Sequence, residues 1–346
     1  MTPLRVLVVD DSPLTIEAVV AILEADGDIQ VVGVAKNGLE AVAETQRIRP
    51  DLVAMDIQMP VMNGLEAVER IMASVPTPIL LLTGDPSRQG ERGSFEALSR
   101  GALDLVAKPA VMAGSGEQQA RFRDHVRLLA KVSVVYRRRK RASGPPPMRP
   151  VRSGGCVGIV GSTGGPPVIA EILAGLPADL PLPVVVVQHL APGFAAHLTS
   201  WLADSSPLPV KQAQHRAMLQ PGVVYVAPDG AHVTVDRRRR LLLDGESPPD
   251  RGHRPSGTRL LRSLAQAFAE LAVGVVVTGM GKDGADGMVA IRRAGGMTIT
   301  QDEATSVVYG MPRAARELGA AEWVRPRDQL AHAICRAAER IVLRAG

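Results

Sequence analysis

Acidic, hydroxyl and amino side chains stand directly after apolar runs in the first third of the chain. They are Asp10, Asp11, Asp56, Thr83 and Lys108. Three carboxylates gathered at one place would bind a hard cation such as Mg²⁺. The cation would offset their mutual repulsion and allow one carboxylate to attack a phosphoryl donor. These residue types therefore predict an aspartyl-phosphate switch.

The order of these residues assigns each of them a role. Asp10, Asp11 and Asp56 are the predicted metal ligands, and Asp56 is also the predicted site of phosphorylation. Lys108 and the Thr83 hydroxyl are predicted to bind oxygens of the phosphoryl group. Helix caps and turns explain any one of these residues equally well. They do not explain five such residues, in order, at the ends of four apolar runs.

A second set of residues has the chemistry of a hydrolase. Ser162 lies in V-G-S-T-G-G-P, His189 ends V-V-V-V-Q-H, and Asp283 lies in G-M-G-K-D-G. In a catalytic triad Ser162 would be the nucleophile, His189 the general base and then acid, and Asp283 the group that orients the imidazole. Taken one at a time, the three residues are equally compatible with a phosphate-binding glycine turn, a structural histidine and an aspartate that forms a turn.

The first set requires a parallel sheet to position it. Residues 1–110 alternate short apolar runs with amphipathic stretches, among them Pro13–Asp26, Gly38–Arg49 and Gly64–Ser74. That alternation predicts βαβ units and a doubly wound, flavodoxin-like α/β domain. Residues 114–136 form a further predicted helix. In such a sheet ligands bind beyond the carboxyl ends of the strands, which is where the five residues fall.

The second set is predicted to lie on a second doubly wound, mostly parallel α/β domain. Its βαβ rhythm runs through Val157–Val160, Val184–Val187 and Val275–Val277. A β-rich excursion interrupts it at Val223–Val235, where P-D-G predicts a hairpin or turn. Arg237–Arg240 is expected to be a solvated turn. Ser162, His189 and Asp283 therefore follow strands of one sheet and can converge.

The two halves are joined by a segment of linker composition. Arg137–Pro150 combines a run of basic residues with Pro and Gly. We expect domains at residues 1–125 and 153–346, with a linker at 126–152.

Composition limits the class of protein. The 346 residues are 46% hydrophobic, 3% aromatic and 22% charged, which is typical of soluble globular proteins. No apolar run approaches the roughly 18 residues of a membrane span, and no signal peptide is recognisable. Cys156 and Cys335 are too few for a disulfide framework. A cytoplasmic protein without membrane insertion is expected.

Charge is divided unequally along the chain. Residues 1–110 carry 9 Lys and Arg against 16 Asp and Glu, and the remainder carries 31 against 19. A basic second half is compatible with binding to nucleic acid or to an acidic protein surface. No known nucleic-acid reader motif accompanies it, so nucleic acid is not an expected partner.

Residues 4–110 resemble the receiver domain of two-component response regulators, through Asp10, Asp11, Asp56, Thr83 and Lys108. The resemblance implies transfer of a phosphoryl group from a histidine kinase to Asp56, with Mg²⁺ bound. One position departs from the family pattern. Leu105 stands where the family usually has Tyr or Phe, which puts the coupling between Thr83 and an aromatic side chain in doubt.

Residues 155–341 resemble the catalytic domain of chemotaxis protein-glutamate methylesterases. The strings that carry the resemblance are G-S-T-G-G-P, V-Q-H, A-P-D-G-A-H, T-G-M-G-K-D-G-A-D-G-M and Y-G-M-P. The resemblance implies hydrolysis of glutamyl methyl esters on the cytoplasmic part of chemoreceptors, with release of methanol, and deamidation of receptor glutamines. It implies the triad Ser162, His189 and Asp283, with backbone oxyanion donors near Thr163 and Met280 and no cofactor in this domain. It also implies that the unphosphorylated receiver inhibits the esterase by docking.

Further residues and alternative functions complete the expectations. Thr258 replaces an Asp that is common in the family, in a segment expected to border the substrate cleft. His197 and His232 are expected to be structural, and Met288 and Met297 to lie in the core. The alternative functions are a phosphorylation-regulated esterase of small molecules, a receptor-binding scaffold without catalysis, and a response regulator that binds nucleic acid.

Overall fold

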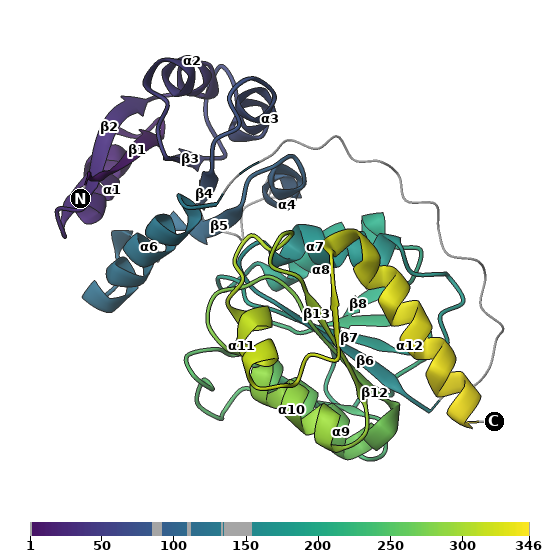
Figure 1. The fold of residues 1–346 in the computed structure, drawn as a ribbon. Helices are drawn as coiled ribbons and strands as arrows, with labels where there is room; N and C mark the ends of the chain where they lie inside the picture. The colour runs from purple at the N-terminus through teal and green to yellow at the C-terminus, as the bar shows by residue number, and fades with distance from the viewer. Residues whose placement is uncertain (1, 85–91, 109–111, 133, 135–153, 346) are drawn as a thin grey trace. The chain divides into compact units, whose positions relative to one another are not determined.

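A computed structural model describes residues 2–84, 92–108, 112–132, 134 and 154–345 (Figure 1). The chain divides into two compact units, Met1–Arg139 and Lys140–Gly346, and each is described by itself. The segment of linker composition at Arg137–Pro150 lies outside the described residues. The domain boundaries at 125, 126, 152 and 153 stay predictions.

The first unit is a five-stranded parallel sheet with the order β2-β1-β3-β4-β5, as the flavodoxin-like prediction requires. Its strands are β1 (Leu4–Val9), β2 (Ile29–Ala35), β3 (Leu52–Asp56), β4 (Ile79–Thr83) and β5 (Asp104–Ala107). Its described helices are α1 (Pro13–Glu24), α2 (Gly38–Ile48), α3 (Gly64–Ser74), α4 (Arg92–Ser99) and α6 (Gly116–Leu129). The strands β3 and β4 are buried along their whole length, as expected for central strands covered on both faces.

Local sequence explains where these helices begin. Ser12, Asn37 and Asn63 cap α1, α2 and α3, each accepting a hydrogen bond from a backbone N–H of the first turn. Ser115 caps α6 in a capping box with Gln118. Helix α6 ends at Leu129, seven residues before the predicted end at 136, and its buried apolar stripe consists of Phe122, Val126 and Leu129.

The second unit is a seven-stranded parallel sheet with the order β14-β13-β12-β6-β7-β9-β8. Its strands are β6 (Cys156–Gly161), β7 (Val184–Gln188), β8 (Val210–Gln212), β9 (Val224–Val226), β12 (Ala272–Val276), β13 (Met297–Gln301) and β14 (Trp323–Arg325). Its α-helices are α7 (Gly165–Ala174), α8 (Ala195–Ser205), α9 (Gly257–Phe268), α10 (Ala285–Arg293), α11 (Met311–Glu317) and α12 (Leu330–Ala345).

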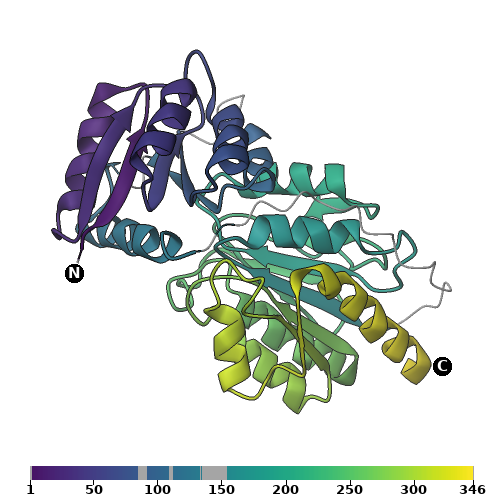
Figure 2. The ribbon, with the colours of Figure 1, turned by 45° about the horizontal axis from the view of Figure 1, so that its top comes forward.

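These helices cover both faces of the second sheet. Helices α9, α10 and α11 pack together on one face, and α7, α8 and α12 lie on the other (Figures 1 and 2). Two short 3₁₀ helices, η1 (Ala269–Leu271) and η2 (Arg327–Gln329), precede β12 and α12. Met288 and Met297 are buried in this unit, as predicted. The doubly wound α/β class is confirmed for both halves of the chain.

The hairpin of the second unit lies one strand later than the prediction at Val223–Val235. Val224–Val226 is β9 of the main parallel sheet, and the P-D-G segment only connects it to β10 (His232–Val235). Strand β10 pairs antiparallel with β11 (Leu241–Asp244), so the hairpin turn is Asp236–Arg240. The arginines of that turn are exposed or half-buried, as expected for a solvated turn. Of the two predicted alternatives, P-D-G is therefore the turn, formed at Asp229 and Gly230, and not the hairpin. A turn signal does not encode which strands pair across it.

Within the described residues, no helix is both long and apolar enough to cross a lipid bilayer.

Candidate active site and acidic cluster

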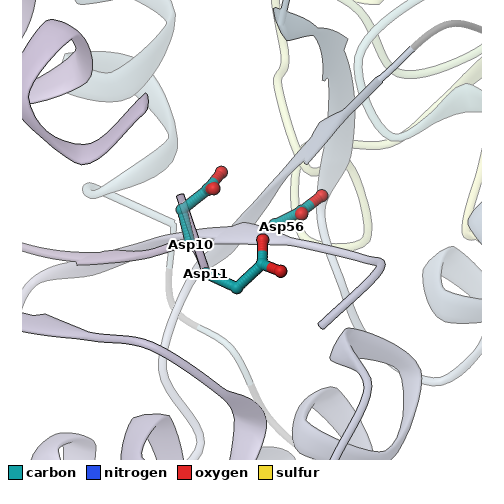
Figure 3. A group of neighbouring side chains, drawn as sticks. All are labelled: Asp10, Asp11 and Asp56. Atoms are coloured by element: carbon teal, nitrogen blue, oxygen red, sulfur yellow. The ribbon is translucent and has the colours of Figure 1, made fainter. Parts of the chain in front are cut away.

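The acidic residues of the first unit meet at the carboxyl edge of its sheet. Carboxylate oxygens of Asp10, Asp11 and Asp56 lie within 4.8 Å of one another (Figure 3). The register explains this closeness, since Val9 pairs with Met55 on adjacent parallel strands and the next residues are Asp10 and Asp56. This set of oxygen donors fits a hard divalent cation such as Mg²⁺.

Lys108 neutralises part of the cluster. Its ammonium lies 2.7 Å from Oδ2 of Asp10 and 2.8 Å from Oδ2 of Asp56. Burial raises the pKa of Asp56, although the ammonium of Lys108 works against that shift. Burial favours the neutral form of Lys108, but hydrogen bonds to Asp10 and Asp56 prevail and raise the pKa of Lys108. Asp56 is thus a buried carboxylate whose partners, within the described part of the chain, are the Ile57 N–H and Lys108.

Thr83 ends β4 beside this cluster. Asp56 on β3 pairs with Leu82 on β4, and Thr83 is the residue after Leu82. Thr83 in turn pairs with Ala107 on β5, and Lys108 is the residue after Ala107. Asp56, Thr83 and Lys108 therefore lie at the same edge of the sheet. Thr83 is buried. Leu105, at the position where an aromatic residue was expected, is buried in β5 opposite Leu81. That Leu105 weakens the coupling between Thr83 and the rest of the receiver stays a prediction.

Ser162 lies in a tight turn between β6 and α7. Gly164 adopts the left-handed conformation there, with φ of 72°, before α7 begins at Gly165. A side chain at Gly165 would put its Cβ 2.1 Å from Oε1 of Gln188, so this close approach requires glycine. The amide of Gln188 donates to the Ser162 carbonyl at 2.8 Å and holds the turn against β7.

His189 stands next to Ser162 on the neighbouring strand. Strands β6 and β7 are parallel, and Gly161 pairs with Gln188, so Ser162 and His189 are the next residues on each strand. Nε2 of His189 lies 2.9 Å from Oδ2 of Asp283. The other ring nitrogen, Nδ1, is buried and makes no hydrogen bond within the described part of the chain. It is thus the nitrogen left to accept a proton.

Five hydrogen-bond donors hold the carboxylate of Asp283. Besides His189, they are Ser256 Oγ and the backbone N–H groups of Gly257, Thr258 and Gly284, at 2.6–3.0 Å. Two of these donors belong to the first turn of α9, whose dipole favours an anion. Burial alone would raise the pKa of Asp283, but the hydrogen bonds from His189 and Thr258 hold it well below its usual range.

Thr258 lies beneath Asp283. Its side chain is only 2% exposed. That the segment Pro255–Leu261 borders the substrate cleft stays a prediction. The Thr258 N–H donates to Asp283, and its hydroxyl accepts a hydrogen bond from the Gly284 N–H at 2.8 Å. Thr258 therefore fixes the carboxylate, because it lies in the first turn of α9.

Sequence reasoning missed three residues at this site. His253 stacks on His189 with ring centroids 3.9 Å apart and planes 5° apart. Ser256 caps α9 and bonds Asp283. Gly279 passes so close to Ser162 that a Cβ there would lie 2.7 Å from the serine Cβ. H-R-P-S-G-T has the Ser of a helix cap, which was a usable signal for Ser256. Nothing in the sequence marks the stacking.

The predicted oxyanion donors are neighbours in sequence of Ser162 and of Gly279, which approach each other closely. Thr163 is buried in the turn after β6, and its carbonyl accepts a hydrogen bond from the Thr278 hydroxyl at 3.0 Å. Met280 is 46% exposed and follows Gly279. Its N–H donates to no acceptor among the described residues. The role of the Thr163 and Met280 backbone as oxyanion donors stays a prediction.

Comparison with known proteins decides the family. Residues 157–334 match the CheB methylesterase family, and residues 6–113 match the response regulator receiver domain family. A protein-glutamate methylesterase/protein-glutamine glutaminase of Anaeromyxobacter dehalogenans is 44% identical over 96% of this chain and 96% of its own length. The chain belongs to the CheB methylesterase family. The resemblance inferred from the sequence motifs is confirmed.

Other CheB-type relatives agree. A protein of the same description from Myxococcus xanthus is 43% identical over 92% of this chain and 90% of its own length. The crystal structure of the Thermotoga maritima CheB methylesterase catalytic domain superposes with a TM-score of 0.51 and 35% identity, covering 55% of this chain and 98% of that one. The two-domain architecture, receiver followed by methylesterase, is therefore that of a chemotaxis adaptation enzyme.

Proposed function

We propose that this CheB-type chain hydrolyses glutamyl methyl esters on the cytoplasmic domains of chemoreceptors, releasing methanol, and deamidates receptor glutamines. The proposed triad is Ser162, His189 and Asp283. The observation that carries the proposal is the hydrogen bond between His189 and Asp283, with Ser162 at the adjacent strand end. A cytoplasmic location follows from the cytoplasmic substrate.

The first half-reaction acylates Ser162. His189 takes the hydroxyl proton on Nδ1 as Oγ attacks the glutamyl carbonyl, and Asp283 stabilises the resulting imidazolium through Nε2. The N–H groups of Thr163 and Met280 bind the oxyanion. The bond from carbonyl carbon to methoxy oxygen then breaks, and methanol leaves with the proton from His189. With a glutamine substrate the leaving group is ammonia.

The second half-reaction releases the product. A water molecule gives a proton to His189 and attacks the acyl carbon, and the bond to Ser162 Oγ breaks. The proton then returns to Ser162, and the receptor keeps a free glutamate.

The acidic cluster is proposed to control this reaction through phosphorylation of Asp56 by a chemotaxis histidine kinase. Asp10, Asp11 and Asp56 would hold Mg²⁺, which when bound neutralises charge on the phosphoryl group. Lys108 contacts Asp10 and Asp56 directly, so it is placed to exchange a carboxylate oxygen for a phosphoryl oxygen. Thr83 is the proposed partner of another phosphoryl oxygen. Phosphorylation is proposed to relieve inhibition of the esterase by the receiver domain.

Methanol release from a methylated receptor cytoplasmic fragment tests both parts of the proposal. We expect release that increases several-fold when acetyl phosphate and Mg²⁺ are added. The Ser162→Ala variant should release none while still binding the fragment, because the hydroxyl contributes to the chemical step alone. Release by Ser162→Ala at the wild-type rate would disprove the triad.

Two controls separate this function from the alternatives. Rapid turnover of short alkyl esters with no turnover of the receptor fragment would favour an esterase of small molecules. Binding of the fragment without any methanol release from several receptors would favour the scaffold.

A further inference from the structure

A buried histidine is connected to the proposed triad through Ser256. His232, on β10, is fully buried, and both of its ring nitrogens have backbone partners. Nε2 lies 3.1 Å from the Pro248 carbonyl oxygen, and Nδ1 lies 3.2 Å from the backbone nitrogen of Ser256. A carbonyl can only accept and an N–H can only donate. The partners therefore require a neutral imidazole with its proton on Nε2.

The Ser256 N–H held by His232 leads directly to the catalytic aspartate. Ser256 is the N-cap of α9, and its hydroxyl lies 3.0 Å from Oδ1 of Asp283 and 3.2 Å from Oδ2 of Asp250. One hydroxyl proton favours the shorter contact with Asp283. The next two residues, Gly257 and Thr258, donate their N–H groups to the same carboxylate. A displacement of Ser256 would therefore move three of the donors that hold Asp283.

We propose that His232 is a positioning residue for the hydrolysis. His232 accepts a hydrogen bond from the Ser256 N–H and so fixes the N-terminus of α9. The N-terminus of α9 in turn fixes the carboxylate of Asp283, which orients His189. The proposal rests on the proposed function, because it takes Asp283 and His189 as parts of the triad. It replaces the expectation that His232 serves only the fold.

The charged groups around His232 fit a neutral ring. Burial lowers the pKa of His232, the hydrogen bond to the Pro248 carbonyl raises it in part, and the nearby Arg259 lowers it again, so that the pKa stays below its usual value. Asp244, paired with His232 across the hairpin, and Asp250 act in the opposite direction without prevailing. The ring therefore stays an acceptor for the Ser256 N–H at neutral pH.

Two substitutions separate the two hydrogen bonds of His232. In His232→Asn the side-chain oxygen can replace Nδ1 as acceptor for Ser256, and the donor to Pro248 is lost. In His232→Gln the amide can replace the Nε2 donor, and the acceptor for Ser256 is lost. We expect His232→Gln to lower kcat by about 10-fold to 100-fold with KM for the receptor fragment unchanged, since small misplacements of catalytic groups have effects of that size. His232→Asn should stay within about threefold of wild type.

A double-mutant cycle tests whether His232 acts through Asp283. In the Asp283→Asn background, His232→Gln should cause no further loss in the rate at which a fluorophosphonate modifies Ser162, followed by mass spectrometry. An equal fractional loss in both backgrounds would overturn the proposal, because it would show a general effect on the fold. Equal kcat values for His232→Asn and His232→Gln would overturn it as well.

The unmodified protein provides a test that does not depend on a folded variant. The ¹⁵N chemical shifts of His232 should show Nε2 protonated and Nδ1 unprotonated at pH 7, and a protonated Nδ1 would overturn the proposal. Failure of the proposed function looks different. It would be methanol release by Ser162→Ala, whereas failure of this inference leaves Ser162→Ala inactive and the two His232 variants alike.

Discussion

The two units each bury an aspartate at the carboxyl edge of a parallel sheet, and they treat its charge in opposite ways. Asp283 accepts five hydrogen bonds, and its pKa is lowered although burial opposes this. Among the residues that the structure describes, Asp56 has one backbone donor, Ile57, and one ammonium, Lys108, and burial raises the pKa of Asp56. The difference matches two proposed roles. A carboxylate that orients a histidine must remain a fixed anion, whereas one that is to be phosphorylated must keep an oxygen available.

Of the substitutions that test this comparison, Asp283→Asn should have the largest effect on the rate of methanol release. The amide keeps the shape of the carboxylate, but its NH₂ group would face a donor, and the charge that stabilises the imidazolium is lost. We expect kcat for methanol release to fall by about 10³–10⁴-fold with little change in KM. Stopped assays over hours with the receptor fragment would measure the residual rate. A fall of less than tenfold would show that His189 works without this partner.

Asp56→Asn should leave basal turnover intact and abolish its stimulation. The variant has no carboxylate to accept the phosphoryl group, so acetyl phosphate and Mg²⁺ should no longer raise methanol release, which we expect to change several-fold in the wild type. Lys108 keeps its ion pair with Asp10, so the receiver should remain folded. If acetyl phosphate stimulates the variant as much as the wild type, Asp56 is not the residue through which phosphorylation controls the esterase.

Much of this contrast was predictable from the sequence, because it depends on where strands end. Five residues of the receiver and three of the catalytic domain follow apolar runs, and in parallel sheets such positions meet at one edge. The partners of Asp283 were not predictable in the same way. Three of its five donors are backbone N–H groups, which no side-chain type signals. Gly257 and Thr258 reach Asp283 only because α9 packs against the sheet, whereas Gly284 is the next residue in the chain. The place of β9 was unpredictable for a similar reason, because it pairs with β7, which is distant in the sequence.

The two aspartates should also give the stability of each unit an opposite dependence on pH. Because the pKa of Asp283 is lowered by folding, its stabilising effect is full above the ordinary value of about 3.9 and is lost only as pH falls below it. Asp283→Asn should therefore be less stable than wild type from pH 7 down to about pH 4. Because the pKa of Asp56 is raised by folding, its ionised form destabilises the receiver at pH 7, and this cost disappears as pH falls toward the ordinary value.

Calorimetry of the full chain at several pH values checks both signs. The receiver transition of Asp56→Asn should lie above that of wild type at pH 7, and the gap should close toward pH 4. The catalytic transition of Asp283→Asn should lie below that of wild type across the same range. If the difference in melting temperature from wild type depends on pH in the same way for both variants, the proposed distinction between Asp283 and Asp56 is wrong.

The smallest effect is expected at His253, whose ring stacks on that of His189. The two rings are parallel with centroids 3.9 Å apart, so His253 limits rotation of the His189 imidazole. The hydrogen bond to Asp283 already restrains that rotation. His253→Ala should lower kcat by about threefold to tenfold, because one of two restraints remains. His253→Phe keeps an aromatic face and should restore most of that loss. If Phe and Ala are equally slow, the imidazole of His253 itself, rather than its stacking, supports His189, and Asp283 is not sufficient to set the plane of the ring.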